Sequence, residues 1–242
     1  LKGEPDNVEG VLMLAEVALK GNNPALAERN YRRAAELGAD PSRTWAGRME
    51  SLLQLGRYDE VLAQAQTPAG LRSFAAPADN ARQALILGRA HIGLQKFTEA
   101  EAYLRESLRV SPTTEAHLEL GRLLAATRRQ PEAEEQLDAA LALGPEDPEA
   151  LLMQAMRLLG KGDQAAAEPV LGQALERGRA EGQMLVQAAA LGTLAELDLA
   201  AKRFAEAEKR AAELARVAGN QPDVRSLRAR IALEQGDVER AK

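Results

Sequence analysis

The 242-residue sequence contains no cysteine, which excludes disulfides, thiolate metal sites and a cysteine nucleophile. Aromatic residues make up only 3% of a chain that is 45% apolar, so burial must depend mainly on alanine and leucine, which have high helix propensity. An all-α protein is therefore expected. The lack of cysteine fits an oxidising compartment as well as a reducing one and leaves the compartment open.

Long apolar runs and a basic stripe are also missing. No stretch approaches the about 18 apolar residues that a transmembrane helix needs, and residues 1–7 lack the apolar core of a signal peptide. The 31 lysines and arginines are interspersed with 36 acidic residues, for a net charge of −5. This balance offers no surface suited to nucleic-acid phosphates, so neither a membrane span nor nucleic-acid binding is expected.

What the sequence does have is an internal repeat. Each copy combines a small residue in a first helix, a short glycine or polar turn, and a small residue near the start of a second helix. The aligned second-helix residues are Ala27, Val61, Ala100, Ala133, Ala167, Ala207 and Ala241. Four of the six spacings lie within one residue of 34, and the other two, 39 and 40, predict insertions of about five or six residues.

Two kinds of break divide the helices. The predicted turns inside the repeats are Gly21-Asn22-Asn23, Gly56-Arg57-Tyr58, Gln95-Lys96-Phe97, Arg128-Arg129-Gln130, Gly162-Asp163, Lys202-Arg203-Phe204 and Gly236-Asp237. The predicted boundaries between repeats carry Pro41, Pro112, Pro145 or Pro148, and Pro222, because proline suits a first helical turn. Helices of about a dozen residues are marginal alone, so each pair is expected to pack on the next.

This pattern resembles the tetratricopeptide repeat (TPR). The residues that carry the resemblance are Leu14-Ala15, Tyr31, Ala34, Trp45, Gly56, Tyr58, Leu87-Gly88, Ala100, Pro112, Leu120-Gly121, Ala133, Ala140, Pro145, Ala155, Gly162-Asp163, Ala167, Ala174, Leu194-Ala195, Phe204 and Ala207. The resemblance implies a right-handed superhelical α-solenoid of about six to seven helix-turn-helix repeats. We expect a single array over 1–242, with repeats at about 8–41, 42–77, 81–113, 114–147, 148–180, 188–220 and, in part, 222–242.

The ends and the two long spacings lead to further expectations. Residues 1–7 read as the tail of a preceding repeat, and Lys242 directly follows Ala241, so the chain is interpreted as a fragment of a longer array. The second helix after Tyr58 is expected to be short and followed by a loop. Residues 177–182 are expected to lengthen a helix or a loop. Both insertions are interpreted as tolerated surface features, with contact to a partner as the alternative.

Candidate chemistry is sparse. His91 and His117 occupy helix positions that the repeat normally fills with packing side chains, and no cysteine, HExxH or Asp-x-Asp motif accompanies them. No glycine-rich segment suits a phosphate between a strand and a helix. We therefore expect no enzyme activity, no cofactor and no metal site.

The informative surface is the groove that the first helices are expected to line. Its predicted partner-binding residues are Leu12, Met13, Glu16, Glu50, Leu85, Arg89, Leu118, Glu119, Arg122, Met153, Met156 and Glu196. Leucine and methionine offer adaptable apolar contact to a protein or peptide, and Arg89 and Arg122 could hold a carboxylate. The alternative for each apolar residue is packing between neighbouring helices. Chaperone-binding TPR domains clamp a terminal carboxylate with asparagine and basic residues, but Glu16, Glu50 and Arg89 occupy those positions here, so such a clamp is not expected.

A narrower resemblance covers residues 8–77. The segments Ala34-Ala35-Glu36-Leu37-Gly38-Ala39-Asp40-Pro41 and Leu52-Leu53-Gln54-Leu55-Gly56-Arg57-Tyr58-Asp59-Glu60-Val61-Leu62 look like the bacterial PEP-CTERM-system TPR lipoproteins (PrsT-like). That resemblance implies an outer-membrane-anchored, largely periplasmic scaffold in exopolysaccharide export or surface-protein sorting. The alternative is a cytoplasmic regulatory module that binds a peptide or an effector domain. The uncapped ends also make end-to-end self-association an expectation.

Overall fold

The computed structural model describes residues 7–67, 76–219 and 221–236, which form 13 α-helices and no strand. Packing divides the chain into two compact units, residues 1–136 and 137–242, with the boundary inside α8. The helices before the boundary are α1 Val8–Lys20, α2 Pro24–Glu36, α3 Pro41–Gln54, α4 Tyr58–Ala65, α5 Pro77–Gly93, α6 Phe97–Val110 and α7 Thr114–Ala126; α8, Gln130–Leu143, spans it. Those after it are α9 Pro148–Gly160, α10 Gln164–Ala180, α11 Met184–Ala200, α12 Phe204–Ala218 and α13 Pro222–Glu234. The prediction of an all-α chain of six to seven helix pairs is confirmed.

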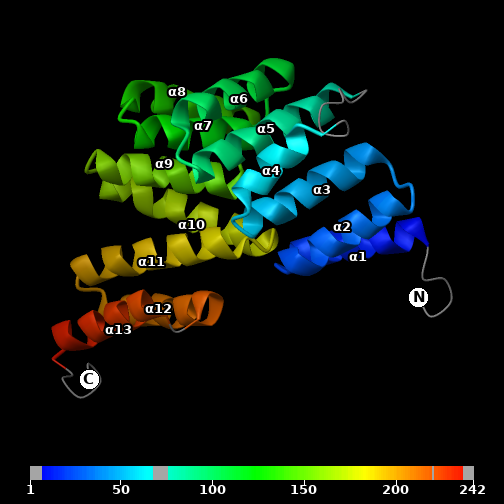
Figure 1. Cartoon of the computed structure of the whole chain (residues 1–242). Coiled ribbons are helices and arrows are strands. Elements are labelled where there is room, and N and C mark those ends of the chain that lie inside the picture. Colours follow the sequence, from blue (N-terminus) through cyan, green and yellow to red (C-terminus); the bar gives the residue numbers. More distant parts are fainter. Residues whose placement is uncertain (1–6, 68–75, 220, 237–242) are drawn as a thin grey trace. The chain divides into compact units, whose positions relative to one another are not determined.

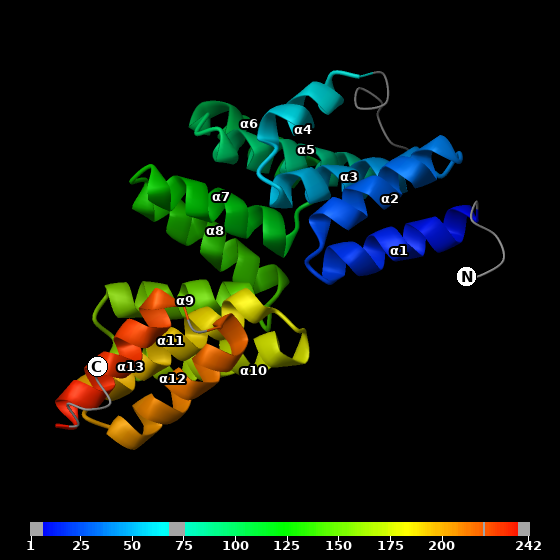
Figure 2. The same cartoon turned by 60° about the horizontal axis from the view of Figure 1, so that its bottom comes forward.

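Within each unit, every helix lies beside the next along the chain (Figures 1 and 2). The odd-numbered helices are the first helices of the pairs. They also touch one another: α1 contacts α3, α3 contacts α5 and α5 contacts α7 in the first unit, and α9, α11 and α13 do the same in the second. Each unit therefore has a face built from consecutive first helices, and all the predicted groove residues belong to these helices.

One backbone motif ends the first helix of all six pairs. Its central residue has a φ between +56° and +81° and is Asn22, Gly56, Gln95, Arg128, Gly162 or Lys202. The next residue's N–H donates to the carbonyl oxygen five positions back at 2.8 to 2.9 Å, as in Arg129 to Leu124. This left-handed cap closes the helix and reverses the chain in three residues, so the six predicted turns are confirmed. The seventh, Gly236-Asp237, extends beyond the described residues.

The side chains in these caps give a first testable prediction. Lys202 has a φ of 59°, a conformation that costs an L-residue with a Cβ about 1–2 kcal/mol. We expect Lys202→Gly to raise the free energy of unfolding by about 1 kcal/mol, measured by urea denaturation. Gly162→Ala is the matched control: its φ is 81° and an added Cβ meets no atom within 4 Å, so only conformational strain should lower its stability. Equal stabilities for Lys202→Gly and the wild type would contradict this account.

The small residues used to align the repeats lie in the core. Ala27, Val61, Ala100, Ala167 and Ala207 are fully buried, and Ala133 is 6% exposed. The small residues of the first helices, Ala15, Gly88, Gly121, Ala155 and Ala195, are buried too. These positions let neighbouring helices approach closely, which explains why the repeat keeps them small.

Both long spacings contain helices of 17 residues. The 39-residue spacing contains α5, which has 17 residues, although α4 before it has only 8, as predicted, and residues 68–75 lie outside the described part. The 40-residue spacing contains two such helices, α10 and α11. Accordingly α11 begins at Met184, four positions before the expected start at residue 188. Residues 1–6 and Ala241, which entered the interpretation of the chain ends, also lie outside the described residues.

Candidate functional site

A row of ion pairs joins consecutive first helices in the first unit. The pairs are Arg43 with Glu9 (3.0 Å), Arg82 with Glu50 (2.7 Å), and Arg89 with Glu115 and Glu119 (2.8 Å each). Glu16 adds a contact of 3.5 Å to Arg43. We call this set the first-helix ion-pair row. Each pair links one first helix to the next, so the row both bridges the pairs of helices and gives their shared face its charge pattern.

The second unit repeats the arrangement between α11 and α13, where Arg230 donates to both oxygens of Glu196 at 2.6 and 2.9 Å. The partners are 34 residues apart, as are Arg43 and Glu9. Arg82 and Glu50 are 32 apart, and Arg89 and Glu119 are 30 apart. Opposite charges about one repeat apart thus become neighbours on adjacent first helices.

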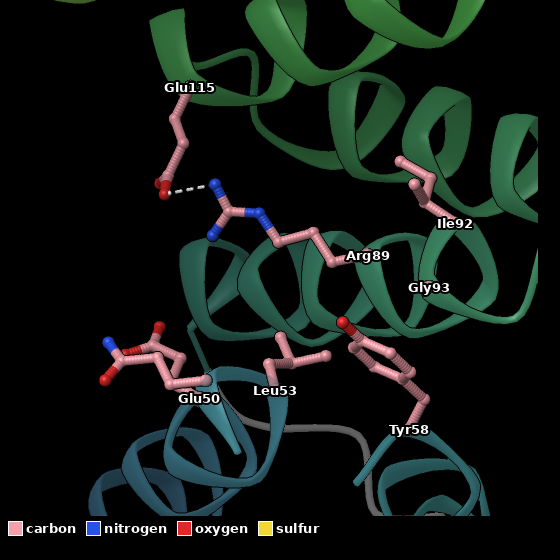
Figure 3. Close-up of a pocket in the computed structure, with 8 residues that line it drawn as sticks. Glu50, Leu53, Tyr58, Arg89, Ile92, Gly93 and Glu115 are labelled. Carbon is pink, nitrogen blue, oxygen red and sulfur yellow. Dashed lines mark ion pairs between the residues drawn. The ribbon is translucent and has the colours of Figure 1, made fainter. Parts of the chain in front are cut away.

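A pocket of about 490 Å³ opens beside the ion-pair row, between α3, α5, the start of α4 and the start of α7. Its lining residues are Glu50, Leu53, Gln54, Tyr58, Arg89, Ile92, Gly93 and Glu115. We call it the Tyr58 pocket. Figure 3 shows two different ends: Glu50 and Glu115 lie near the guanidinium of Arg89, whereas Tyr58, Ile92 and Gly93 lie at the opposite end. The pocket therefore combines an apolar, aromatic end with a charged end.

Gly93 shapes the aromatic end. A Cβ added there would lie 2.5 Å from Cζ of Tyr58, so the ring can rest on α5 only because residue 93 has no side chain. Tyr58 and Leu53 are themselves only partly exposed and pack with the core cluster that contains Met49, Val61 and Ile86. The pocket floor is thus continuous with the core and held by it, as expected of a preformed binding site.

Two TPR family models match the sequence, one over residues 12–67 and 86–148 and the other over residues 158–231. The chain belongs to the tetratricopeptide-repeat family. No curated protein matches the sequence.

Several solved structures share this fold. A thermophilic TPR protein from Thermus thermophilus, TTC0263, aligns with a TM-score of 0.62 and 21% identity over 75% of this chain and 98% of its own. PilF from Pseudomonas aeruginosa aligns with a TM-score of 0.59 and 17% identity over 92% of this chain and 96% of its own. Yeast Tom70 aligns with 0.64 and 17% over 97% of this chain, which spans only 48% of Tom70. These likenesses establish the fold. TPR proteins mediate protein–protein interactions, and their fold is typically a non-catalytic scaffold.

Three of the apolar residues predicted to line the TPR groove are in the core instead. Leu12 is 1% exposed, Leu85 4% and Leu118 1%. Each packs in a hydrophobic core or between helices, so these side chains are not available to a partner. The alternative interpretation, packing between helices, is the right one for them.

The predicted methionines are more accessible. Met13 is 63% exposed and shares one face of α1 with Leu14 and Val17, which are 47% and 62% exposed. Met156 on α9 is 40% exposed, and Met153 is half-buried. The uncovered face of α1 is compatible with contact to another chain, and end-to-end self-association stays a prediction that light scattering across a concentration range would check.

The predicted charged residues all lie on the first helices, but the chain itself already pairs them. Nε and Nη2 of Arg89 both donate to Glu119, and Nη2 also reaches Glu115. Burial alone would lower the pKa of Arg89, but the carboxylates of Glu119 and Glu115 outweigh it and raise that pKa. Arg122 lies 3.5 Å from Glu119. Two carboxylates of α7 are thus already bonded to Nε and Nη2 of Arg89, and the binding of a ligand carboxylate by Arg89 stays a prediction.

Sequence reasoning missed several residues of this face. The partners Glu9, Arg43, Arg82, Glu115 and Arg230 were not singled out, nor were Leu53, Gln54, Tyr58, Ile92 and Gly93 as pocket residues. A search for opposite charges about one repeat apart would have found the ion pairs. The pocket has no such signal, since it depends on how the Tyr58 ring lies against Gly93.

Both histidines pack as expected of structural residues. His117 Nδ1 lies 2.8 Å from Oε1 of Gln136, and the His91 ring stacks on Tyr103 with centroids 5.2 Å apart. Within residues 7–67, 76–219 and 221–236, no three His, Asp or Glu side chains come together as metal ligands would. None of the helices described is long and apolar enough to cross a membrane.

The buried His91 ring should make stability depend on pH. Its Nδ1 is buried with no hydrogen-bond partner among the described residues, and burial lowers the pKa of the imidazole, with Lys96 adding to that and Glu99 opposing it. Because the folded pKa lies below the unfolded value of about 6.5, the neutral form favours folding. We expect this contribution to be complete above about pH 6.5 and to be lost as the pH falls through the folded pKa.

The matched variant is His91→Leu, since Leu124 fills the equivalent position of α7. Urea denaturation between pH 7 and pH 5 should show the wild type losing stability relative to this variant. Parallel curves for the two proteins would mean that His91 does not titrate differently on folding.

Proposed function

We propose that this TPR chain is a non-catalytic scaffold that binds an extended segment of another protein on the first-helix face of residues 1–136. The Tyr58 pocket carries the proposal. It opens on that face, has a volume of about 490 Å³, and offers an apolar wall beside fixed polar groups. This combination gives both contact area and orientation to a bound side chain.

The ion-pair row supports the same proposal. Because Arg43, Arg82 and Arg89 bridge neighbouring first helices, a ligand meets a face whose side chains are already held in place. Holding side chains before binding reduces the conformational entropy that the complex must lose. Of the predicted groove residues, Glu50 and Arg89 line the pocket, and Glu16 and Glu119 belong to the adjoining row.

We propose further that the full protein works in a bacterial envelope, in exopolysaccharide export or surface-protein sorting, as an outer-membrane-anchored and largely periplasmic scaffold. The resemblance of residues 8–77 to PEP-CTERM-system TPR lipoproteins supports this placement. The absence of cysteine in the chain is compatible with an oxidising compartment.

Capture from separate envelope and cytosolic extracts of a bacterium tests both proposals. The bait is the 242-residue chain, compared with Leu53→Glu, which puts a charge in the pocket wall. Leu185→Glu is the control, because Leu185 is 88% exposed and lies on α11. The proposals predict an envelope protein, identified by mass spectrometry, that binds the wild type and the control but not Leu53→Glu. Capture of only a cytosolic partner would favour the cytoplasmic regulatory module, and binding that survives Leu53→Glu would contradict the pocket.

A further inference from the structure

The charged end of the Tyr58 pocket carries more acid than base. Its lining side chains include two carboxylates, Glu50 and Glu115, and one guanidinium, Arg89. That guanidinium is bonded to Glu115 and, from the adjoining row, to Glu119. Glu50 in turn accepts two bonds from Arg82, so each lining carboxylate already has one guanidinium partner, and a ligand cation would share these carboxylates with Arg82 and Arg89.

The two lining carboxylates keep acceptor capacity. Both bonds from Arg82 end on Oε1 of Glu50, and the contact from Arg89 ends on Oε1 of Glu115. Within the part of the chain that the structure describes, Oε2 of each residue is left as an acceptor. Glu50 has 25% of its side chain exposed and Glu115 has 56%, so both can be reached from the pocket.

The rest of the pocket suits a long aliphatic stem. Leu53 and Ile92 supply apolar walls, and the Tyr58 ring is held against Gly93 (Figure 3). Lysine and arginine bury their methylene stems along apolar surface while their charged heads remain beside polar groups. The pocket offers the same sequence of surroundings, from the apolar end at Tyr58 to the polar end at Glu115.

From this geometry we infer that the Tyr58 pocket binds a lysine or arginine side chain of the partner protein. The stem lies on Leu53, Tyr58 and Ile92, and the cationic head lies between Glu50 and Glu115. The inference rests on the proposed function and names the side chain that the site selects. The side chain that we infer is a cation, whereas a site that held a ligand carboxylate at Arg89 would bind an anion.

Selection from a phage-displayed library of random linear peptides tests the inference, with the 242-residue chain as target. Selected peptides should share a lysine or arginine at one position. Replacing that residue with norleucine, which keeps the stem, should weaken binding at least tenfold in fluorescence polarisation. Glu50→Gln/Glu115→Gln should weaken the basic peptide by a similar factor and should have little effect on the norleucine peptide. Glu9→Gln is the control, because it removes a carboxylate of the ion-pair row outside the pocket.

The outcomes separate the inference from the proposed function. Peptides that lose binding with Leu53→Glu but keep it within twofold when the basic residue becomes norleucine would overturn the inference and leave the proposed function standing. Selection of acidic peptides that depend on Leu53 would do the same. If no selected peptide depends on Leu53, both are overturned. Circular dichroism of each variant confirms that it is folded before affinities are compared.

Discussion

Replacing Gly47 with alanine should destabilise the protein, although glycine-to-alanine changes inside a helix normally stabilise by about 1 kcal/mol. Gly47 lies in the middle of α3, and an added Cβ would be 2.2 Å from Cζ of Tyr31 and 2.6 Å from each Cε. The Tyr31 ring is 4% exposed in a core cluster with Leu12 and Ala15, so it has little room to move. Overpacking of this kind typically costs about 1–3 kcal/mol, which should appear as a lower midpoint in urea denaturation.

Two further variants make the Gly47 result specific. Gly172→Ala in α10 is the control, because its added Cβ meets nothing within 4 Å and should give the ordinary stabilisation of a helix. Tyr31→Leu removes much of the obstructing ring and should recover part of what Gly47→Ala loses. If Gly47→Ala and Gly172→Ala both stabilise, Tyr31 does not restrict the α2–α3 interface.

In the interface between α4 and α5, the large and the small residue are exchanged between the two helices. Counting by the repeat, Tyr31 and Gly47 correspond to Ala65 and Ile86, which share one core cluster. A large residue thus faces a small one in each interface, but on opposite helices. In these two interfaces the small residue leaves room for the large one opposite it.

The helix pairs could be predicted from sequence because their signals are local. Glycine or polar residues end the first helices at Gly56 and Gly162, and buried small residues such as Ala27 and Ala100 recur in the second helices. Such features depend on a few neighbouring residues and on the helical period of about 3.6 residues. These local features can be recognised without knowing which helices contact one another.

The outward-facing side chains were harder to assign for a geometric reason. Residues 11–15 are all apolar, so periodicity does not say which of them faces the core. Adjacent residues on a helix point about 100° apart, and here Leu12 is 1% exposed while Met13 is 63% exposed. Assigning both to one groove could not be right. The charged residues were hard to assign for another reason. Whether Glu50 or Arg89 forms an ion pair within the chain depends on a partner about one repeat away in the sequence.

A buried carboxylate in the second unit gives the other large expected effect. Asp198 on α11 is fully buried and accepts bonds from Arg203 Nε at 2.7 Å and Arg210 Nη1 at 2.5 Å. Arg210 also donates to the carbonyl oxygen of Leu194, and Arg203 also binds Glu168 at 2.9 Å. Removing one partner of a buried ion pair typically costs about 3–5 kcal/mol, because the other charge stays buried. We expect Arg210→Ala to lower the free energy of unfolding by about 3 kcal/mol, near the lower end of this range, because Arg203 still pairs with Asp198.

Removing the carboxylate itself should cost much less, because no buried charge is then left without a partner. The position equivalent to Asp198 holds Leu52 in α3, Leu124 in α7 and Leu158 in α9, each accepting the same cap hydrogen bond through its backbone carbonyl. Leucine therefore fits the backbone at this point, and Asp198→Leu leaves two arginines that are 41% and 27% exposed and can reach solvent. Asp198→Leu/Arg210→Ala should be more stable than Arg210→Ala alone by urea denaturation. Additive losses in the double variant would instead mean that Arg210 acts through its stem or through Leu194, and not by compensating the buried charge of Asp198.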